Sequence, residues 1–513
     1  MTATEEGPAQ RRWAAAALVA SLLAGSVAGC SASGGDGKTL ADRSDRSTTS
    51  EAGDGSTPPN TTDGTGTGPS DAPDPEVDDV ADEVLDGLGD PRIDVDHYDL
   101  VVQADPSVTG VTGTATLTLS ATTAEPLPSF TLDLRGPEVT SATVDGSEAA
   151  VAVEDSGAEI VVTPATPLEP DRDAELVLAY EGEPEPSEFP GLRVPVGWQA
   201  DDEGGWFTMS EPDGTSSWVP VNEHPSDKAT WTITLDTPAD AVGISNGRLM
   251  SKDVEGDRRI WVWDTDEPMA SYLVLAAVGD YDLVERTGPD DVRIAMAFPS
   301  SLPDRARVGF DELDDILAFY RDTFGGLPDD DAGAIVVATS LGLALETQTR
   351  PLFGIEAAGD GKVWALAHEV AHQWYGDAVS PASWADLWLN EGFATYADWL
   401  YLDHTGEVSM ENSAAAGAGG VPSAGALAVL DPEAAARFDG VVYDGGARVL
   451  HALRLTVGDE KFFEILQRWF ADNDGTSVTT DDFIALATDV SGADLGAFFD
   501  DWLTSPDQPD FPS

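Results

Sequence analysis

The chain has 513 residues, a formal net charge of −68 and a single cysteine. This length leaves room for two or three domains with sizeable cores. The charge rules against nucleic acid as a partner, because phosphate binding requires a basic face, and one cysteine rules out an intrachain disulfide. An acid-rich surface is typical of adaptation to high salt, but simple solubility explains it equally well.

Residues 1–29 have the composition of a secretory signal. Two arginines precede the apolar run WAAAALVASLLAGSVAG, which ends just before Cys30. A basic start, an apolar run of this length and small residues after it predict a cleaved signal rather than a membrane-spanning helix. The four residues VAGC, ending at Cys30, resemble a bacterial lipobox. This resemblance implies that Cys30 becomes the lipidated N-terminus of a lipoprotein, which would be anchored to the cell membrane on its extracytoplasmic face.

Residues 30–90 form a segment rich in Gly, Ser, Thr, Asp and Pro, with almost no large apolar side chains. Such a composition cannot bury enough apolar surface to offset the entropy of ordering the chain. It predicts a disordered, flexible tether that holds a folded body away from the membrane.

Residues 91–299 predict an all-β domain. Short segments that alternate apolar and polar residues, or are rich in β-branched side chains, recur between turn residues, as is typical of strands. The clearest of these segments are HYDLVVQAD, GTATLTLSA, FTLDL, AEIVVT, AELVLAYEG, ATWTITLDT and RRIWVWDT.

Residues 300–513 predict a mostly helical domain. PDRARVGFDELDDILAFYRDTFG has a helical pattern, GAIVVATS and GLALETQ have the pattern of strands, and three amphipathic helices close the chain. Thr-Thr-Asp-Asp is a helix N-cap signal at the start of one of them. The sequence therefore predicts an α+β multidomain protein.

The segment 361–377, GKVWALAHEVAHQWYGD, holds two of the six histidines of the chain. It predicts a helix, because no proline interrupts it and apolar residues recur on one face. His368 and His372 are four residues apart and therefore project from the same face. H-E-x-x-H on a helix is the arrangement in which two imidazoles bind zinc and the glutamate, here Glu369, acts as a general base.

Catalytic zinc needs a third protein ligand and an open fourth position for water. The helical segment 385–400, ADLWLNEGFATYADWL, supplies Glu391, with 18 residues between it and His372. This interval accommodates one loop and a returning helix. Asp398, on the same predicted helix, is a candidate hydrogen-bond partner for a zinc-binding histidine.

H-E-x-x-H, 18 residues and then N-E-G-F-A resemble the gluzincin aminopeptidases of the membrane alanyl/leucyl aminopeptidase type, relatives of leukotriene-epoxide hydrolase. The resemblance covers about residues 91–505. It implies a β-saddle domain followed by a thermolysin-like catalytic domain, one zinc ion, and an aminopeptidase that acts on peptides as a monomer. Relatives often carry a further helical domain and this chain ends without one, so the sequence does not determine how enclosed the cleft is.

The resemblance also implies residues that bind the substrate and the transition state. In GVVYDGGARVLHALR, two residues separate Tyr443 from a Gly-Ala pair, as in the tyrosine helix of the family, and Tyr443 carries over as the oxyanion donor. Gly445 stands where the family usually has a lysine. Glu346 in LALET corresponds to the glutamate of the family motif Gly-Ala-Met-Glu-Asn, and Glu211 in TMSEPDGTSSWVPVNEHP corresponds to a second anchor. The two carboxylates would bind the α-ammonium of the substrate.

Other functions stay open. The same zinc chemistry serves an endopeptidase or an epoxide hydrolase, and a substrate with a blocked N-terminus distinguishes an endopeptidase from an aminopeptidase. A catalytically silent cell-surface binding protein is the remaining alternative. The intact set of His368, Glu369, His372, Glu391 and Tyr443 argues against it, because a silent site is free to lose any of these residues.

Overall fold

The computed structural model describes residues 82, 84–85, 87–107, 109–154, 158–359, 362–420 and 427–512, without the side chains of residues 418–420. The predicted signal, Cys30 and nearly all of the predicted tether lie outside these residues. Within the described part of the chain, no helix is long and apolar enough to cross a membrane.

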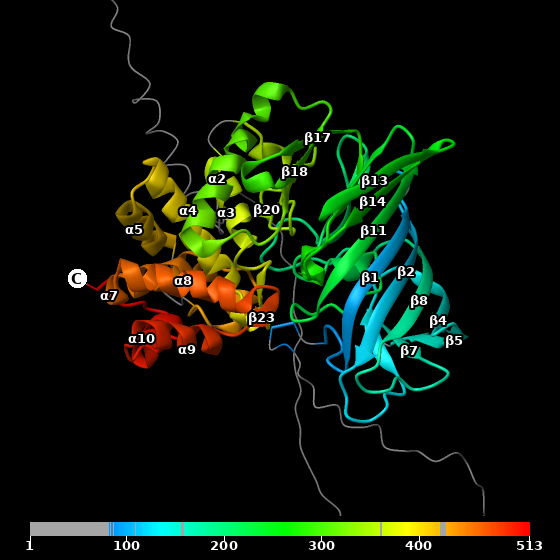
Figure 1. The fold of residues 1–513 in the computed structure, drawn as a ribbon, viewed down its shortest axis with the longest axis horizontal. Coiled ribbons are helices and arrows are strands. Elements are labelled where there is room, and N and C mark those ends of the chain that lie inside the picture. The colour runs from blue at the N-terminus through cyan, green and yellow to red at the C-terminus, as the bar shows by residue number, and fades with distance from the viewer. Residues whose placement is uncertain are drawn as a thin grey trace, which may run out of the picture. The chain divides into compact units, whose positions relative to one another are not determined.

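A nine-stranded sheet dominates the N-terminal region of the described chain (Figure 1). Its strands run in the order β13 (Arg248–Glu255), β14 (Arg258–Asp264), β11 (Lys228–Pro238), β1 (Ile93–Gln103), β2 (Val111–Ala121), β8 (Ala174–Gly182), β4 (Glu138–Val144) and β5 (Ser147–Glu148), and β15 (Met269–Ala270) pairs with β11. Strands β1 and β11 are parallel, whereas β1 and β2 are antiparallel. Alternate residues of β2 are buried, so the period-two pattern of the sequence places one face of the sheet on a core.

Two smaller sheets complete the all-β region of the described chain. One has the order β3 (Phe130–Asp133), β7 (Glu159–Thr163) and β6 (Ala150–Val153), and the other has the order β12 (Val242–Ser245), β16 (Ala276–Gly279), β10 (Gly205–Met209) and β9 (Gly197–Ala200). Strand β10 leads directly into the loop that carries Glu211. The prediction of an N-terminal all-β domain is confirmed.

The second region contains a five-stranded sheet with the order β17 (Tyr281–Thr287), β18 (Arg293–Pro299), β19 (Asp331–Val336), β21 (Leu352–Phe353) and β20 (Ala344–Leu345). The predicted boundary at residue 299 falls inside this sheet, because β18 pairs with β19 in parallel and β17 pairs with β18. Residues 281–299 therefore belong to the sheet of the second region. Their alternating pattern predicts strands correctly but carries no information about which sheet the strands join.

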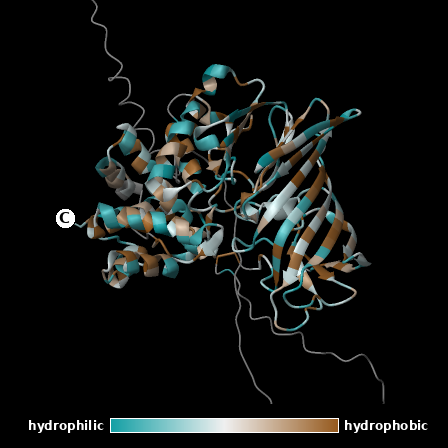
Figure 2. Cartoon of the chain, in the orientation of Figure 1, coloured by the Kyte–Doolittle hydropathy of each residue, from teal (hydrophilic) through white to brown (hydrophobic). Residues whose placement is uncertain are grey.

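Helices make up most of the remaining second region, as predicted. The described helices are α2 (Leu313–Tyr320), α3 (Val363–His372), α4 (Trp388–Thr405), α5 (Met410–Gly420), α6 (Pro432–Ala435), α7 (Gly446–Val457), α8 (Asp459–Asn473), α9 (Thr480–Ser491) and α10 (Gly496–Leu503), and a short strand pair joins β22 (Val379–Pro381) to β23 (Thr476–Val478). The predicted N-cap begins α9, where the side chains of Thr479 and Asp482 bond each other's backbone amides. Figure 2 shows apolar and polar residues alternating along the large sheet and mixed on the helices.

Helices α3 and α4 pack against each other, and α3 also contacts the edge strand β20. The apolar face of α3 is buried through Leu366 and Val370. Helix α4 is followed by its C-cap residue Gly406, whose left-handed backbone (φ 74°) favours glycine. Because these elements meet, residues far apart in the sequence converge on the H-E-x-x-H helix.

Candidate metal centre

Helix α3 presents the two histidines of the motif side by side. Their ring centroids are 4.7 Å apart, as a spacing of four residues on one helix face allows. His372 is fully buried, whereas 13% of the His368 side chain is exposed. The helix thus holds one imidazole inside the protein and the other at the edge of the site.

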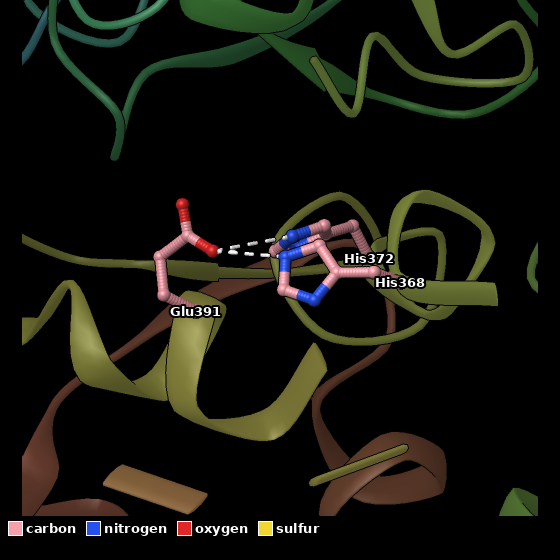
Figure 3. A group of neighbouring side chains, drawn as sticks. All are labelled: His368, His372 and Glu391. Atoms are coloured by element: carbon pink, nitrogen blue, oxygen red, sulfur yellow. Dashed lines mark hydrogen bonds and ion pairs between the residues drawn. The ribbon is translucent and has the colours of Figure 1, made fainter. Parts of the chain in front are cut away.

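Glu391 completes the predicted ligand set from the neighbouring helix α4. Its Oε2 atom lies 3.3 Å from Nε2 of His368 and 3.4 Å from Nε2 of His372 (Figure 3). Burial alone would raise the pKa of Glu391, but the two neighbouring imidazoles outweigh this effect and lower it to about 2. Two imidazole nitrogens and one carboxylate oxygen that converge on one point are a donor set typical of catalytic zinc.

The other ring nitrogen of each histidine faces an acceptor away from the donor set. Nδ1 of His368 lies 3.4 Å from Oδ2 of the buried Asp398, and Nδ1 of His372 lies 3.2 Å from the carbonyl oxygen of Tyr375. Such partners hold the proton on Nδ1 and leave Nε2 free to bind a metal. The residues present therefore fit a zinc ion in ring orientation as well as in composition.

Glu369 lies on the same helix but belongs to a different group of atoms. Its carboxylate lies close to the carboxylate of Glu346 and to an imidazole nitrogen of His372, and it is not in the set formed by His368, His372 and Glu391. Burial raises the pKa of Glu369 to about 7. This position, close to the ligands without joining them, suits a residue that exchanges protons next to the metal.

Tyr443 approaches the donor set from the turn before α7. It lies in the π-helical segment η10 (Val441–Gly445), and its ring stacks near the His368 ring with a centroid distance of 6.3 Å. Burial, followed by the charge of Glu391, raises the pKa of Tyr443 well above its usual range. The phenol thus keeps its proton at neutral pH and is available as a hydrogen-bond donor.

A contact between two glycines brings Tyr443 to this place. A Cβ atom on Gly392, the residue after the ligand Glu391, would lie 2.8 Å from Cα of Gly446 at the start of α7. Only glycine at both positions permits this approach of α4 to α7. The glycine of N-E-G-F-A therefore has a packing role that the sequence analysis did not recognise.

Glu346 and Glu211 converge on the same site from different regions of the fold. Glu346 follows β20, Glu211 follows β10, and their carboxylates lie in one cluster of ligand atoms with Glu391. Both residues are buried. Burial, and then the charges of Glu346 and Glu391, raise the pKa of Glu211 well above its usual range. Carboxylates this close to one another favour a bound cation.

Two amide side chains that the sequence analysis did not single out also contact the site. Asn390 donates a hydrogen bond to the Glu346 carboxylate, and Gln373 donates one to the Glu346 backbone. Asn390 precedes the candidate ligand Glu391, and Gln373 follows the candidate ligand His372. Their position beside the predicted ligands was the only signal in the sequence. It does not reveal that both amides contact Glu346, because that contact depends on the tertiary structure.

Both regions of the chain are similar to known proteins. The sequence profile of the Peptidase M1 N-terminal domain matches residues 94–273, and that of the Peptidase family M1 domain matches residues 362–502. The crystal structure of an M1 zinc metallopeptidase from Deinococcus radiodurans is 32% identical in sequence, with a TM-score of 0.77, and the match covers 84% of this chain and 98% of that chain. A mutant form of an M1 zinc metallopeptidase from the same organism, bound to a Tyr-Ser-Ala substrate, matches with 31% identity and the same TM-score over 84% of this chain and 99% of that one.

Longer proteins are also similar. Aminopeptidase M1 of Arabidopsis thaliana is 27% identical over 59% of this chain and 37% of its own length. Glutamyl aminopeptidase of Sus scrofa is 25% identical over 80% of this chain and 47% of its own length. The chain thus spans less than half the length of these curated relatives.

Proposed function

The chain belongs to peptidase family M1, and we propose on this premise that it is a zinc-dependent aminopeptidase that removes the N-terminal residue of peptides. The observation that carries the proposal is the convergence of Glu211 and Glu346 beside the donor set of His368, His372 and Glu391. Two carboxylates next to a metal site provide an anchor for the free α-ammonium of a peptide. The first peptide bond of the bound substrate would then lie at the metal.

The residues of the chain supply the remaining chemistry. Zinc, when bound, acidifies a water molecule and polarises the scissile carbonyl. Glu369 takes the proton of the attacking water and delivers it to the leaving amine. Tyr443 donates its phenolic proton in a hydrogen bond to the oxygen of the scissile carbonyl as negative charge develops there.

A comparison of free and blocked substrates tests the aminopeptidase proposal. We expect the enzyme to hydrolyse an aminoacyl amide and to act poorly on its N-acetylated form, because the acetylated form lacks the ammonium. In Glu346→Gln, kcat/KM for the free amine should fall roughly 10- to 150-fold, the effect of a hydrogen bond to a charged group. The acetylated substrate should be hardly affected, and about one zinc per chain should be retained, since Glu346 is not a ligand.

The same experiment distinguishes the alternatives. Equal rates on free and acetylated peptides would indicate an endopeptidase. Zinc binding without hydrolysis of any peptide would favour a silent binding protein or an epoxide hydrolase, and an epoxide substrate distinguishes these two. Full zinc content and full activity in His372→Ala would refute the proposal that His372 binds the zinc ion.

We propose further that the protein is a bacterial lipoprotein, held at the extracytoplasmic face of the cell membrane through Cys30. The support is the sequence around Cys30, which has a basic start, an apolar run and the residues VAGC. Two acyl chains of a diacylglycerol group suffice for stable anchoring, where a single chain is marginal. Cys30→Ser should move the protein out of the membrane fraction, and its full retention there would contradict the proposal. The proposed monomeric state is checked by sedimentation of the chain without residues 1–30.

A further inference from the structure

Glu346 lies one residue beyond the end of a strand. Strand β20 ends at Leu345 and is at the edge of the five-stranded sheet, where β21 is its partner among the described strands. The backbone ladder therefore stops before it reaches the carboxylate that the proposed function requires. Something other than strand pairing has to fix that carboxylate relative to the metal.

Two buried amides hold Glu346 in place. Nδ2 of Asn390 donates to Oε1 of Glu346 over 2.9 Å, and Nε2 of Gln373 donates to its carbonyl oxygen over 3.2 Å. Oε1 of Gln373 also accepts a hydrogen bond from the backbone amide of Thr349, at 2.6 Å. A single glutamine thus holds both ends of the segment 346–349, while the asparagine holds the Glu346 side chain.

Each amide is the direct neighbour of a metal ligand in the chain. Gln373 follows His372 at the end of α3, and Asn390 precedes Glu391 in the first turn of α4. A displacement of either helix therefore moves a ligand and an amide together. The distance between the Glu346 carboxylate and the metal is set from two directions by the helices that hold the metal.

A neutral amide is suited to this role on electrostatic grounds. A lysine or arginine beside Glu346 would neutralise the carboxylate and compete with the ammonium of a substrate. A carboxylate in the same place would repel Glu346. The neutral amide of Asn390 provides one hydrogen bond to the Glu346 carboxylate and adds no charge that would compete with a substrate ammonium.

We propose that Asn390 and Gln373 are positioning residues that fix the distance between the ammonium anchor and the metal, and so align the first peptide bond of the substrate with the zinc site. The proposal rests on the proposed function, because it assigns the ammonium to Glu346. The two residues act through Glu346 and do not touch the reacting atoms.

A double-mutant cycle on kcat/KM for an aminoacyl amide tests this coupling. Asn390→Ala should lower kcat/KM about 10-fold, the lower end for a hydrogen bond to a charged group. In a Glu346→Ala background the same substitution should have less than about a threefold effect, because residues that act through one contact are non-additive. Gln373→Met, which keeps the length of the side chain and removes both of its hydrogen bonds, should show the same pattern and serves as a second variant if Asn390→Ala does not fold.

The control is Asn473→Ala, which also removes one amide hydrogen bond, from Nδ2 to the carbonyl oxygen of Trp469 on α8. It should leave kcat/KM unchanged in both backgrounds. All variants should retain zinc, measured by elemental analysis. Equal losses in the wild-type and Glu346→Ala backgrounds, or no loss in either, would overturn the positioning role. An unchanged kcat/KM in Glu346→Ala itself would instead refute the ammonium assignment on which the proposal rests.

Discussion

Replacing Glu223 by glutamine should reduce the loss of folding stability that the protein undergoes as the pH rises from mild acid to neutral. Glu223 is 1% exposed and lies in the connection between β10 and β11, which also carries Glu211. Its Oε2 accepts a hydrogen bond from the Ser216 amide at 2.6 Å, whereas its buried Oε1 has no partner among the described residues. Burial, and then the nearby carboxylate of Asp133, raise the pKa of Glu223 to about 8.

The sign and size of the effect follow from proton linkage. Between pH 4.5, the ordinary value for this group, and pH 8, Glu223 is protonated in the folded state and ionised in the unfolded state. Its contribution to stability is therefore full below the unfolded pKa and is lost as the pH rises towards the folded pKa. The loss is on the order of 1 kcal/mol per pH unit, or roughly 2–3 kcal/mol between pH 5.5 and 7.5. Glutamine does not titrate, so the variant does not undergo this loss of stability.

Urea unfolding of the wild type and of Glu223→Gln at pH 5.5 and 7.5 measures the difference. The wild type should lose more stability than the variant over this interval, by roughly 2–3 kcal/mol. Glu148→Gln, which removes an exposed carboxylate of β5, controls for the general acidity of the chain. The reasoning is refuted if Glu223→Gln and Glu148→Gln change with pH to the same extent.

Three further substitutions test the metal centre. Asp398→Asn should weaken zinc binding about 10- to 100-fold, because the carboxylate that orients His368 loses its charge, and competition with a chelator measures this change. Tyr443→Phe should keep zinc and lower kcat about 10²- to 10³-fold, the effect of losing one oxyanion donor, and an unchanged kcat would remove the phenol from the mechanism. Gly392→Ala should force α4 away from α7 and cost about 1–3 kcal/mol, and denaturant unfolding at constant pH checks this value. An alanine variant of normal stability would show that the helices tolerate the extra atom.

The residues of the candidate donor set were predictable to lie close together because the geometry of the two histidines is local. A spacing of four residues places His368 and His372 on one helix face before any tertiary structure is considered. Glu391 followed from the chemistry of zinc, which needs a third ligand, and from a helical pattern at a suitable distance. The roles of Tyr443, Glu346 and Glu211 came from family resemblance, because nothing in their local sequence indicates a partner.

The contacts that were not predicted depend on elements far apart in the chain. The Gly392–Gly446 contact requires knowledge of how α4 crosses α7, and a glycine within a helical pattern does not reveal it. The bond from Asn390 to Glu346 joins residues 44 positions apart. The pairing of β17 and β18 with β19, on the other side of residue 299, was not predictable for a related reason, since strand patterns do not specify which strands will pair.

The strand pairing of β17 and β18 has a consequence for anyone who wishes to produce the second region alone. A polypeptide that starts at residue 300 contains His368, Glu369, His372, Glu391 and Tyr443, yet it exposes the bare edge of β19. An unpaired strand edge invites association with a second copy, so such a fragment is prone to aggregate. A start before Tyr281 retains the hairpin and covers that edge. This longer fragment would still lack Glu211, and it therefore offers a way to study metal binding separately from the second carboxylate of the amine anchor.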